Sequence, residues 1–110
     1  MDISVSERDG ASVVALTGRL DLLSAAQVKA RLAQEAGAGL KRLVVDLGDV
    51  SFIDSSGLGA LISALKAARV AGGDLRIARP SDQARVILKL TTLDRVMKPY
   101  ASVEEALADF

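Results

Sequence analysis

The chain has 110 residues, half of them hydrophobic, and its 14 basic residues balance 14 acidic ones, which is typical of a single domain with a buried core. The balanced charge and the small number of aromatic residues argue against nucleic-acid binding, which needs a basic face or rings on which bases can stack. The chain contains no cysteine and no histidine, and this excludes disulfides, thiol chemistry and the most common general base and metal ligand.

The N-terminal part is predicted to form a β-hairpin. Apolar residues alternate with serines in residues 3–6, which is the pattern of a half-exposed strand. Asp9-Gly10 is a tight-turn signal, and the apolar run 12–18 is the returning strand. The acidic, alternating start is unlike a signal peptide. The longest uncharged run, 55–65, is much shorter than the roughly 20 apolar residues of a membrane span. We therefore expect a cytoplasmic protein without a membrane span.

Single helices and single strands alternate along the rest of the chain. Ser24 and Gln27 have the spacing of a capping box and predict a helix that ends near Gly37 or Gly39. The later predicted elements are a buried strand at 42–47, a helix from about Ser55 to Gly72-Gly73, a strand at 74–78, a helix from Pro80-Ser81 to Leu90, a short strand closed by Pro99, and a helix started by a Ser102–Glu105 capping box. This order predicts one α/β domain over residues 1–110, with a mixed sheet that has an antiparallel hairpin followed by parallel strands, and about four helices.

The sequence gives little support for an enzyme. Ser55 or Ser56 would need a base within hydrogen-bonding reach to act as a nucleophile. The chain has no histidine, and Lys66 lies three turns along the predicted helix. The stretch GLGALI lacks the third glycine of a dinucleotide-binding loop, and no phosphate-binding P-loop motif occurs. We therefore expect no catalytic residue in this chain.

The stretch DSSGLG, residues 54–59, joins a predicted buried strand to a predicted helix. The carboxyl end of such a strand is where open parallel sheets place their functional groups, and a helix start presents free amides and the positive end of a dipole. One serine could cap the helix while the other hydroxyl points outward. Alternatively, both serines could serve only the cap and the turn. The residues alone leave these two interpretations open.

Acidic residues surround this stretch. No Lys or Arg occurs from Leu43 to Leu65, whereas Asp46, Asp49 and Asp54 do. A Mg²⁺ site is one interpretation of these carboxylates, but Asp49 fits a turn and Asp54 fits a helix start, so we expect no metal site. Asp21 also follows a predicted strand and should lie at the same end of the sheet. A phosphate added to a serine here would bring about −1.5 to −2 charge to an acidic edge. It would therefore switch binding rather than folding.

Residues 44–78, VVDLGDVSFIDSSGLGALISALKAARVAGGDLRIA, strongly resemble the STAS domain family, which includes the bacterial anti-sigma factor antagonists. LTGRLD at 16–21 resembles the other recurring stretch of the family, and 86–110 is similar in layout. The resemblance implies a small α/β domain that binds a kinase-type anti-sigma factor and thereby frees the sigma factor that this kinase held.

The resemblance also implies a role for individual residues. Ser55 matches the serine that the partner kinase phosphorylates with Mg-ATP, and a serine phosphatase then restores the free hydroxyl. Leu58 is expected in the core. Ser56 is then the neighbouring cap or turn residue, and the glycines allow close backbone approach. The chain itself would hold no cofactor. The implied partner-binding residues are Asp21, Asp54, Ser56, Gly57 and Gly59.

Two other functions stay open at this point. Some STAS domains are never phosphorylated and serve as a scaffold or as an accessory subunit of a transporter ATPase or a stress-signalling complex. The intact DSSG favours the switch. The third class is an enzyme or a small-ligand binder.

Overall fold

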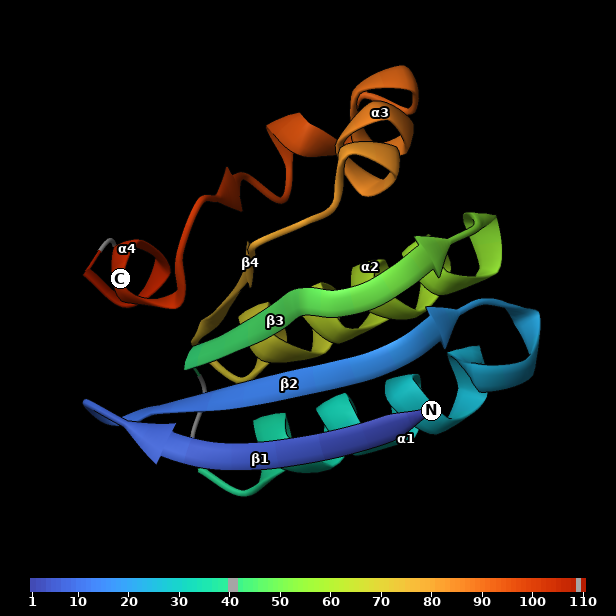
Figure 1. The fold of residues 1–110 in the computed structure, drawn as a ribbon. Coiled ribbons are helices and arrows are strands. Elements are labelled where there is room, and N and C mark those ends of the chain that lie inside the picture. The colour runs from blue at the N-terminus through green and yellow to red at the C-terminus, as the bar shows by residue number, and fades with distance from the viewer. Residues whose placement is uncertain (40–41, 109) are drawn as a thin grey trace.

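The computed structural model describes residues 1–39, 42–108 and 110. Its elements follow the predicted order of strands and helices (Figure 1). They are β1 (Asp2–Arg8), β2 (Ala11–Leu20), α1 (Leu22–Gly37), β3 (Arg42–Ile53), α2 (Ser55–Val70), β4 (Asp74–Ala78), α3 (Asp82–Leu90), the 3-10 turn η1 (Leu93–Arg95), β5 (Pro99–Tyr100) and α4 (Val103–Ala108).

The five strands form one mixed sheet in the order β1-β2-β3-β4-β5. β1 and β2 are antiparallel, with Arg8 paired to Ala11, and the other neighbouring strands are parallel. Asp9 and Gly10 form the two-residue turn with φ values of 52° and 78°, the left-handed backbone that this kind of hairpin turn requires. The predicted hairpin and mixed sheet are therefore confirmed.

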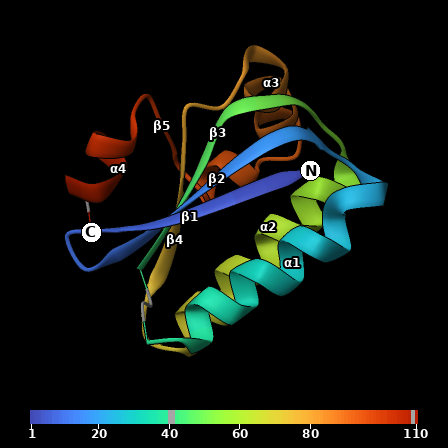
Figure 2. The same cartoon turned by 60° about the horizontal axis from the view of Figure 1, so that its bottom comes forward.

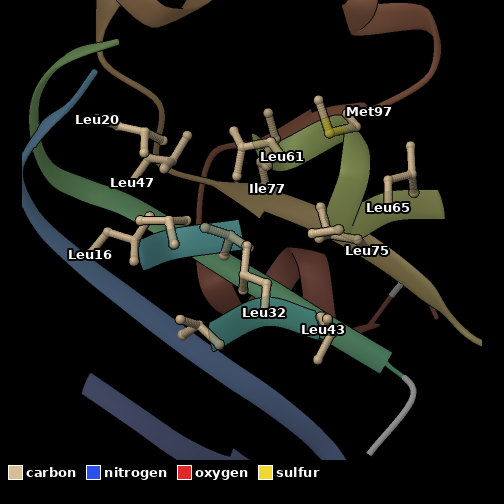
Figure 3. Close-up of a cluster of buried hydrophobic side chains, with 14 of the residues drawn as sticks. Leu16, Leu20, Leu32, Leu43, Leu47, Leu61, Leu65, Leu75, Ile77 and Met97 are labelled. Atoms are coloured by element: carbon tan, nitrogen blue, oxygen red, sulfur yellow. The ribbon is translucent and has the colours of Figure 1, made fainter. Parts of the chain in front are cut away.

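Helices cover both faces of the sheet. α1 and α2 lie side by side on one face, and α4 covers the opposite face (Figure 2). Leucines of the sheet and of the two long helices dominate the larger core cluster (Figure 3). α3 contributes Ala84 and Leu88 to this cluster. The smaller cluster lies between the sheet and α4 and comprises Val13, Val44, Ala78, Tyr100, Val103 and Ala106. In the described ranges, no helix is long and apolar enough to cross a membrane.

The first helix begins earlier than predicted. Asp21 is its N-cap: the Asp21 carboxylate accepts the amide of Leu23, and the hydroxyl of Ser24 accepts the amide of Asp21. Ser24 is thus the third helical residue of a capping box, and Gln27 instead donates to the carbonyl of Met1. The predicted Ser24–Gln27 box is wrong, because Asp21 is an equally good cap and stands directly after the last residue of β2.

Two strand predictions are also wrong in their boundaries. β3 continues past the predicted end at residue 47 to Ile53, and Asp49 pairs with Thr17 within this strand instead of forming a turn. Irregular register between β2 and β3 accompanies this extension. Pro99 begins β5 rather than closing it, because residues 93–95 form η1.

Candidate functional site: the starts of α1 and α2

Asp54 caps the helix that contains DSSGLG. Its backbone is extended, with φ −114° and ψ −174°, and its Oδ1 accepts the amide of Gly57 at 2.9 Å. A carboxylate in this position satisfies a free amide and faces the positive end of the helix dipole. The expectation that a serine caps α2 is therefore wrong for both Ser55 and Ser56. They are the first and second residues inside the helix.

The structure separates the two serines by exposure. Ser55 is exposed at the first position of α2, and Ser56 is half-buried. Within the described part of the chain, neither hydroxyl has a hydrogen-bond partner, since the Asp54 carboxylate has taken the capping role. The Ser55 side chain is consequently accessible at the edge where β3 ends.

The start of α1 lies beside the start of α2. The amide of Leu22 donates to Oδ2 of Asp54 at 3.3 Å, and the amide of Asp54 donates to the carbonyl of Leu20 at 3.2 Å. Asp21, which caps α1, is therefore at the same end of the sheet as Asp54, as predicted. Figures 1 and 2 show that α1 and α2 both begin at this end of the sheet. The C-terminal end of LTGRLD and the start of DSSGLG therefore lie side by side.

The two glycines of DSSGLG have different surroundings. Gly57 is buried, and a Cβ there would meet the carbonyl oxygen of Leu20, the Leu20 Cγ at 2.8 Å and the Ile53 Cγ1 at 3.0 Å. The close approach predicted for Gly57 is thus made within the domain, between α2 and the strand ends. Gly59 is exposed, and a Cβ there would have no neighbour within 4 Å. Leu58 is buried, which confirms its predicted core position.

Gln83 supports this edge from α3. Its Oε1 accepts the amide of Ile53 at 3.0 Å, and its Nε2 donates to the carbonyl of Ile53 at 2.8 Å. The side chain thus pairs with the end of β3 much as a neighbouring strand would, one residue before Asp54. Gln83 is not predictable from the sequence, because its partner is 30 residues away and nothing local in the sequence marks the contact.

The charges of the edge are less uniformly acidic than predicted. Arg19 lies 3.4 Å from Asp21, and its guanidinium is 4.4 Å from the centroid of the Phe52 ring. LTGRLD therefore contributes a cation as well as a carboxylate to this surface.

Asp46 lies in the middle of β3, where it forms an ion pair with Arg79. Both oxygens of the carboxylate accept from the guanidinium at 2.8 Å, and Oδ1 also accepts the amide of Gly48 at 3.0 Å. Burial raises the pKa of Asp46, but the hydrogen bonds from Arg79 and Gly48 and the positive charge of Arg79 outweigh it, so the pKa lies below its ordinary value. In the described ranges, no three carboxylates converge as metal ligands.

Comparisons with known proteins agree with this geometry. The family model of the STAS domain matches residues 2–106. A protein of Thermotoga maritima is 34% identical over 71 residues, which cover 64% of this chain and 63% of that relative. A crystal structure from Thermotoga maritima has a TM-score of 0.91 at 27% identity and covers 97% of this chain and 92% of the other. The chain thus matches less than two thirds of the length of that sequence relative.

Two further relatives extend over nearly the whole chain. The anti-sigma-B factor antagonist of Bacillus subtilis is 27% identical over 106 residues, covering 94% of each protein. The crystal structure of an anti-sigma factor antagonist from Mycobacterium paratuberculosis has a TM-score of 0.88 at 26% identity and covers 98% of this chain and 92% of the other. With its mixed sheet, its intact DSSGLG helix start and a family match over almost its full length, the chain belongs to the STAS domain family.

Proposed function

We propose that this chain is an anti-sigma factor antagonist whose binding is switched off by phosphorylation of Ser55. In its unphosphorylated form it binds a kinase-type anti-sigma factor, and the sigma factor held by that kinase is released. The relatives named as antagonists support the general function. The observation that supports the switch is the exposed Ser55 hydroxyl at the first position of a helix that Asp54 already caps.

The chemistry of the switch belongs to the partners. The kinase, which binds Mg-ATP, transfers the γ-phosphoryl group to Oγ of Ser55, the hydroxyl loses its proton and ADP leaves. A serine phosphatase later hydrolyses the ester to restore the hydroxyl and release inorganic phosphate. The antagonist contributes an accessible nucleophile and needs no cofactor of its own.

Electrostatics explains why a phosphate would prevent binding without unfolding the domain. The two negative charges of a phosphate, placed about 8 Å from one carboxylate, are repelled by that carboxylate. The repulsion is roughly 1 kcal/mol in water and roughly 4 kcal/mol at an effective dielectric constant of about 20. The second value corresponds to about a thousandfold loss of affinity. In the free domain the phosphate stays in water and faces the positive end of the α2 dipole, which favours it by about 0.3–1 kcal/mol. The free energy of unfolding should therefore change little.

The direct test is phosphorylation in vitro. The chain is incubated with each kinase-type anti-sigma factor of its host and Mg-ATP, and the modified residue is located by peptide mass spectrometry. We expect phosphate on Ser55, with Ser56→Ala as the matched control that remains a substrate. Phosphate on Ser56 alone would overturn the assignment. Tight binding without any phosphorylation would favour the alternative, a STAS domain that acts as a scaffold or accessory subunit.

Binding measurements test the electrostatic argument separately. Ser55→Ala should retain the affinity of the unphosphorylated chain for the kinase, whereas Ser55→Asp should weaken it. Calorimetry with the purified kinase would measure both dissociation constants. Equal affinities of the two variants would contradict a switch based on charge.

A further inference from the structure

We propose that Leu22 and Leu23 are apolar anchors by which this chain docks on its kinase partner. This inference rests on the proposed function and adds the chemistry of the contact surface. In the described part of the chain, these leucines are 74% and 93% exposed, and Leu23 has the largest exposed fraction of any large hydrophobic residue. They are consecutive residues in the first turn of α1.

The fold itself does not use these two side chains. The buried stripe of α1 comprises Ser24, Val28, Leu32 and Ala36, so the first two helical positions fall outside it. The start of the helix is held by backbone amides, through the Asp21 cap and the bond from Leu22 to Asp54. Polar residues could provide the same amides. Single exposed apolar residues are common, but an adjacent pair at the edge of a modification site calls for a contact outside the domain.

Leu22 and Leu23 lie close enough to Ser55 for the kinase that modifies Ser55 to cover them. A typical specific interface buries about 800 Å² on each partner, which is a patch with a radius of about 16 Å. The amide of Leu22 lies 3.3 Å from the carboxylate of Asp54, the residue directly before Ser55. A kinase that encloses the Ser55 hydroxyl with an interface of this size would also cover the start of α1. Leu22 and Leu23 would then be desolvated together with the switch residue.

The surroundings of the leucines define what the partner must offer. Asp21 and Asp54 lie beside them, and the neighbouring cation, Arg19, is in contact with Asp21 and Phe52. The complementary surface is therefore an apolar depression with neutral hydrogen-bond donors at its rim, because basic side chains there would attract a phosphate on Ser55 and strengthen the contact. Apolar anchors in such pockets commonly provide most of the binding energy of an interface. In the closed contact, a phosphate on Ser55 would add about −1.5 to −2 charge next to Asp54, and the repulsion there is larger than in water.

The test compares two exposed apolar sites on the same chain. Leu22→Ser/Leu23→Ser is compared with Val70→Ser, since Val70 is 90% exposed at the last residue of α2. At 1.5 Å per residue, Val70 lies about 22 Å along the helix from Ser55 and thus outside the expected interface. Calorimetry with the kinase that phosphorylates Ser55 should show a dissociation constant roughly tenfold or more higher for the double serine variant. Val70→Ser should bind like the wild type.

Two additional measurements make the result decisive. Leu22→Met/Leu23→Met retains the apolar surface and should bind nearly as tightly as the wild type, while thermal unfolding shows that every variant is folded. Wild-type affinity of the double serine variant, or equal weakening by Val70→Ser, would overturn the anchor role. In either case, phosphorylation of Ser55 in the same samples would leave the proposed function intact. A wild-type chain that no anti-sigma kinase of the host binds or phosphorylates would overturn the proposed function and the anchor role with it.

Discussion

The carboxylate of Asp54 accepts the backbone amide of Leu22 at 3.3 Å, across 32 residues of sequence. Its other oxygen accepts the amide of Gly57 at 2.9 Å. One side chain thus satisfies a free amide in the first turn of each of two helices, groups that would otherwise be without an intrahelical acceptor. The carboxylate therefore holds the start of α1 and the start of α2 as a unit, so that a partner meets both segments in a fixed relation.

Replacing Asp54 should separate its two roles. Asp54→Ala removes both acceptors and should lower the free energy of unfolding by about 1–2 kcal/mol. Asp54→Asn retains one carbonyl oxygen for the cap of α2, and asparagine is as good a cap as aspartate, but its amide group cannot accept the amide of Leu22. We therefore expect a smaller loss for Asp54→Asn. Urea denaturation followed by circular dichroism would measure both values.

The matched control for this comparison is Ser81→Ala, which removes an N-cap that accepts one amide, that of Ala84, in α3. Its cost should be close to the usual value for a single cap, about 1 kcal/mol. An Asp54→Ala variant that costs less than Ser81→Ala would contradict the double role of the carboxylate.

The two glycines of DSSGLG should respond in opposite ways to alanine. A Cβ at Gly57 would meet the backbone carbonyl of Leu20 and would lie 2.8 Å from the Leu20 Cγ. Since a backbone atom cannot move aside cheaply, Gly57→Ala should destabilise the domain by about 1–3 kcal/mol. Gly59 has open space around the added methyl group, so Gly59→Ala should stabilise α2 by about 0.5–1 kcal/mol through helix propensity. Thermal unfolding would show whether each variant is less or more stable than the wild type.

Gly59→Ala also tests the partner surface that the sequence resemblance predicted. If Gly59 allows close approach of the kinase, this variant should bind more weakly although it is more stable. Unchanged affinity would remove Gly59 from the predicted interface and would leave the stability prediction unaffected.

The sequence predicted those parts of the fold that depend on local pattern. Alternating residues and the Asp9-Gly10 turn marked the hairpin, Ser81 was placed at the start of α3, and residues 74–78 form the predicted strand. Asp54 is at the predicted helix start, but the assignment of the caps of α1 and α2 to serines is wrong, because Ser and Asp compete for the same role within a few positions. Which of them caps a helix depends on where the preceding strand ends, and that is settled by pairing with a distant strand.

The contacts that support the site could not be predicted in the same way. Gln83 and Ile53 are 30 residues apart, and Asp46 and Arg79 are 33 residues apart. Each residue on its own resembles an ordinary surface polar residue. The role of Ser55 stays a prediction that rests on the family motif. The exposure of Leu22 and Leu23 is not predictable from the sequence, because leucines are expected in a core.

Gln83 should stabilise the end of β3 in particular. Gln83→Met has a similar length but leaves the amide and the carbonyl of Ile53 without their side-chain partner. Loss of two hydrogen bonds at a half-buried site should lower the free energy of unfolding by about 1–3 kcal/mol. Hydrogen exchange would show faster exchange of the Ile53 amide, whereas the amide of Val45, in the middle of β3, should change only with global stability. Equal acceleration at both residues would contradict a local role.

The ion pair of Asp46 with Arg79 should make stability depend on pH in the acidic range. The pKa of Asp46 is below its ordinary value in the folded chain, so its contribution is fully present above the unfolded pKa of about 4 and is lost as the pH falls through the lower folded pKa. The Asp46 side chain is 12% exposed and that of Arg79 is 47% exposed, so we expect Asp46→Asn to cost about 0.5–1 kcal/mol at pH 7. Urea denaturation at pH 7, 5, 4 and 3 should show this difference unchanged down to about pH 5 and shrinking below pH 4. A difference that grows as the pH falls would mean that burial, which raises the pKa of this carboxyl, outweighs the two bonds from the guanidinium.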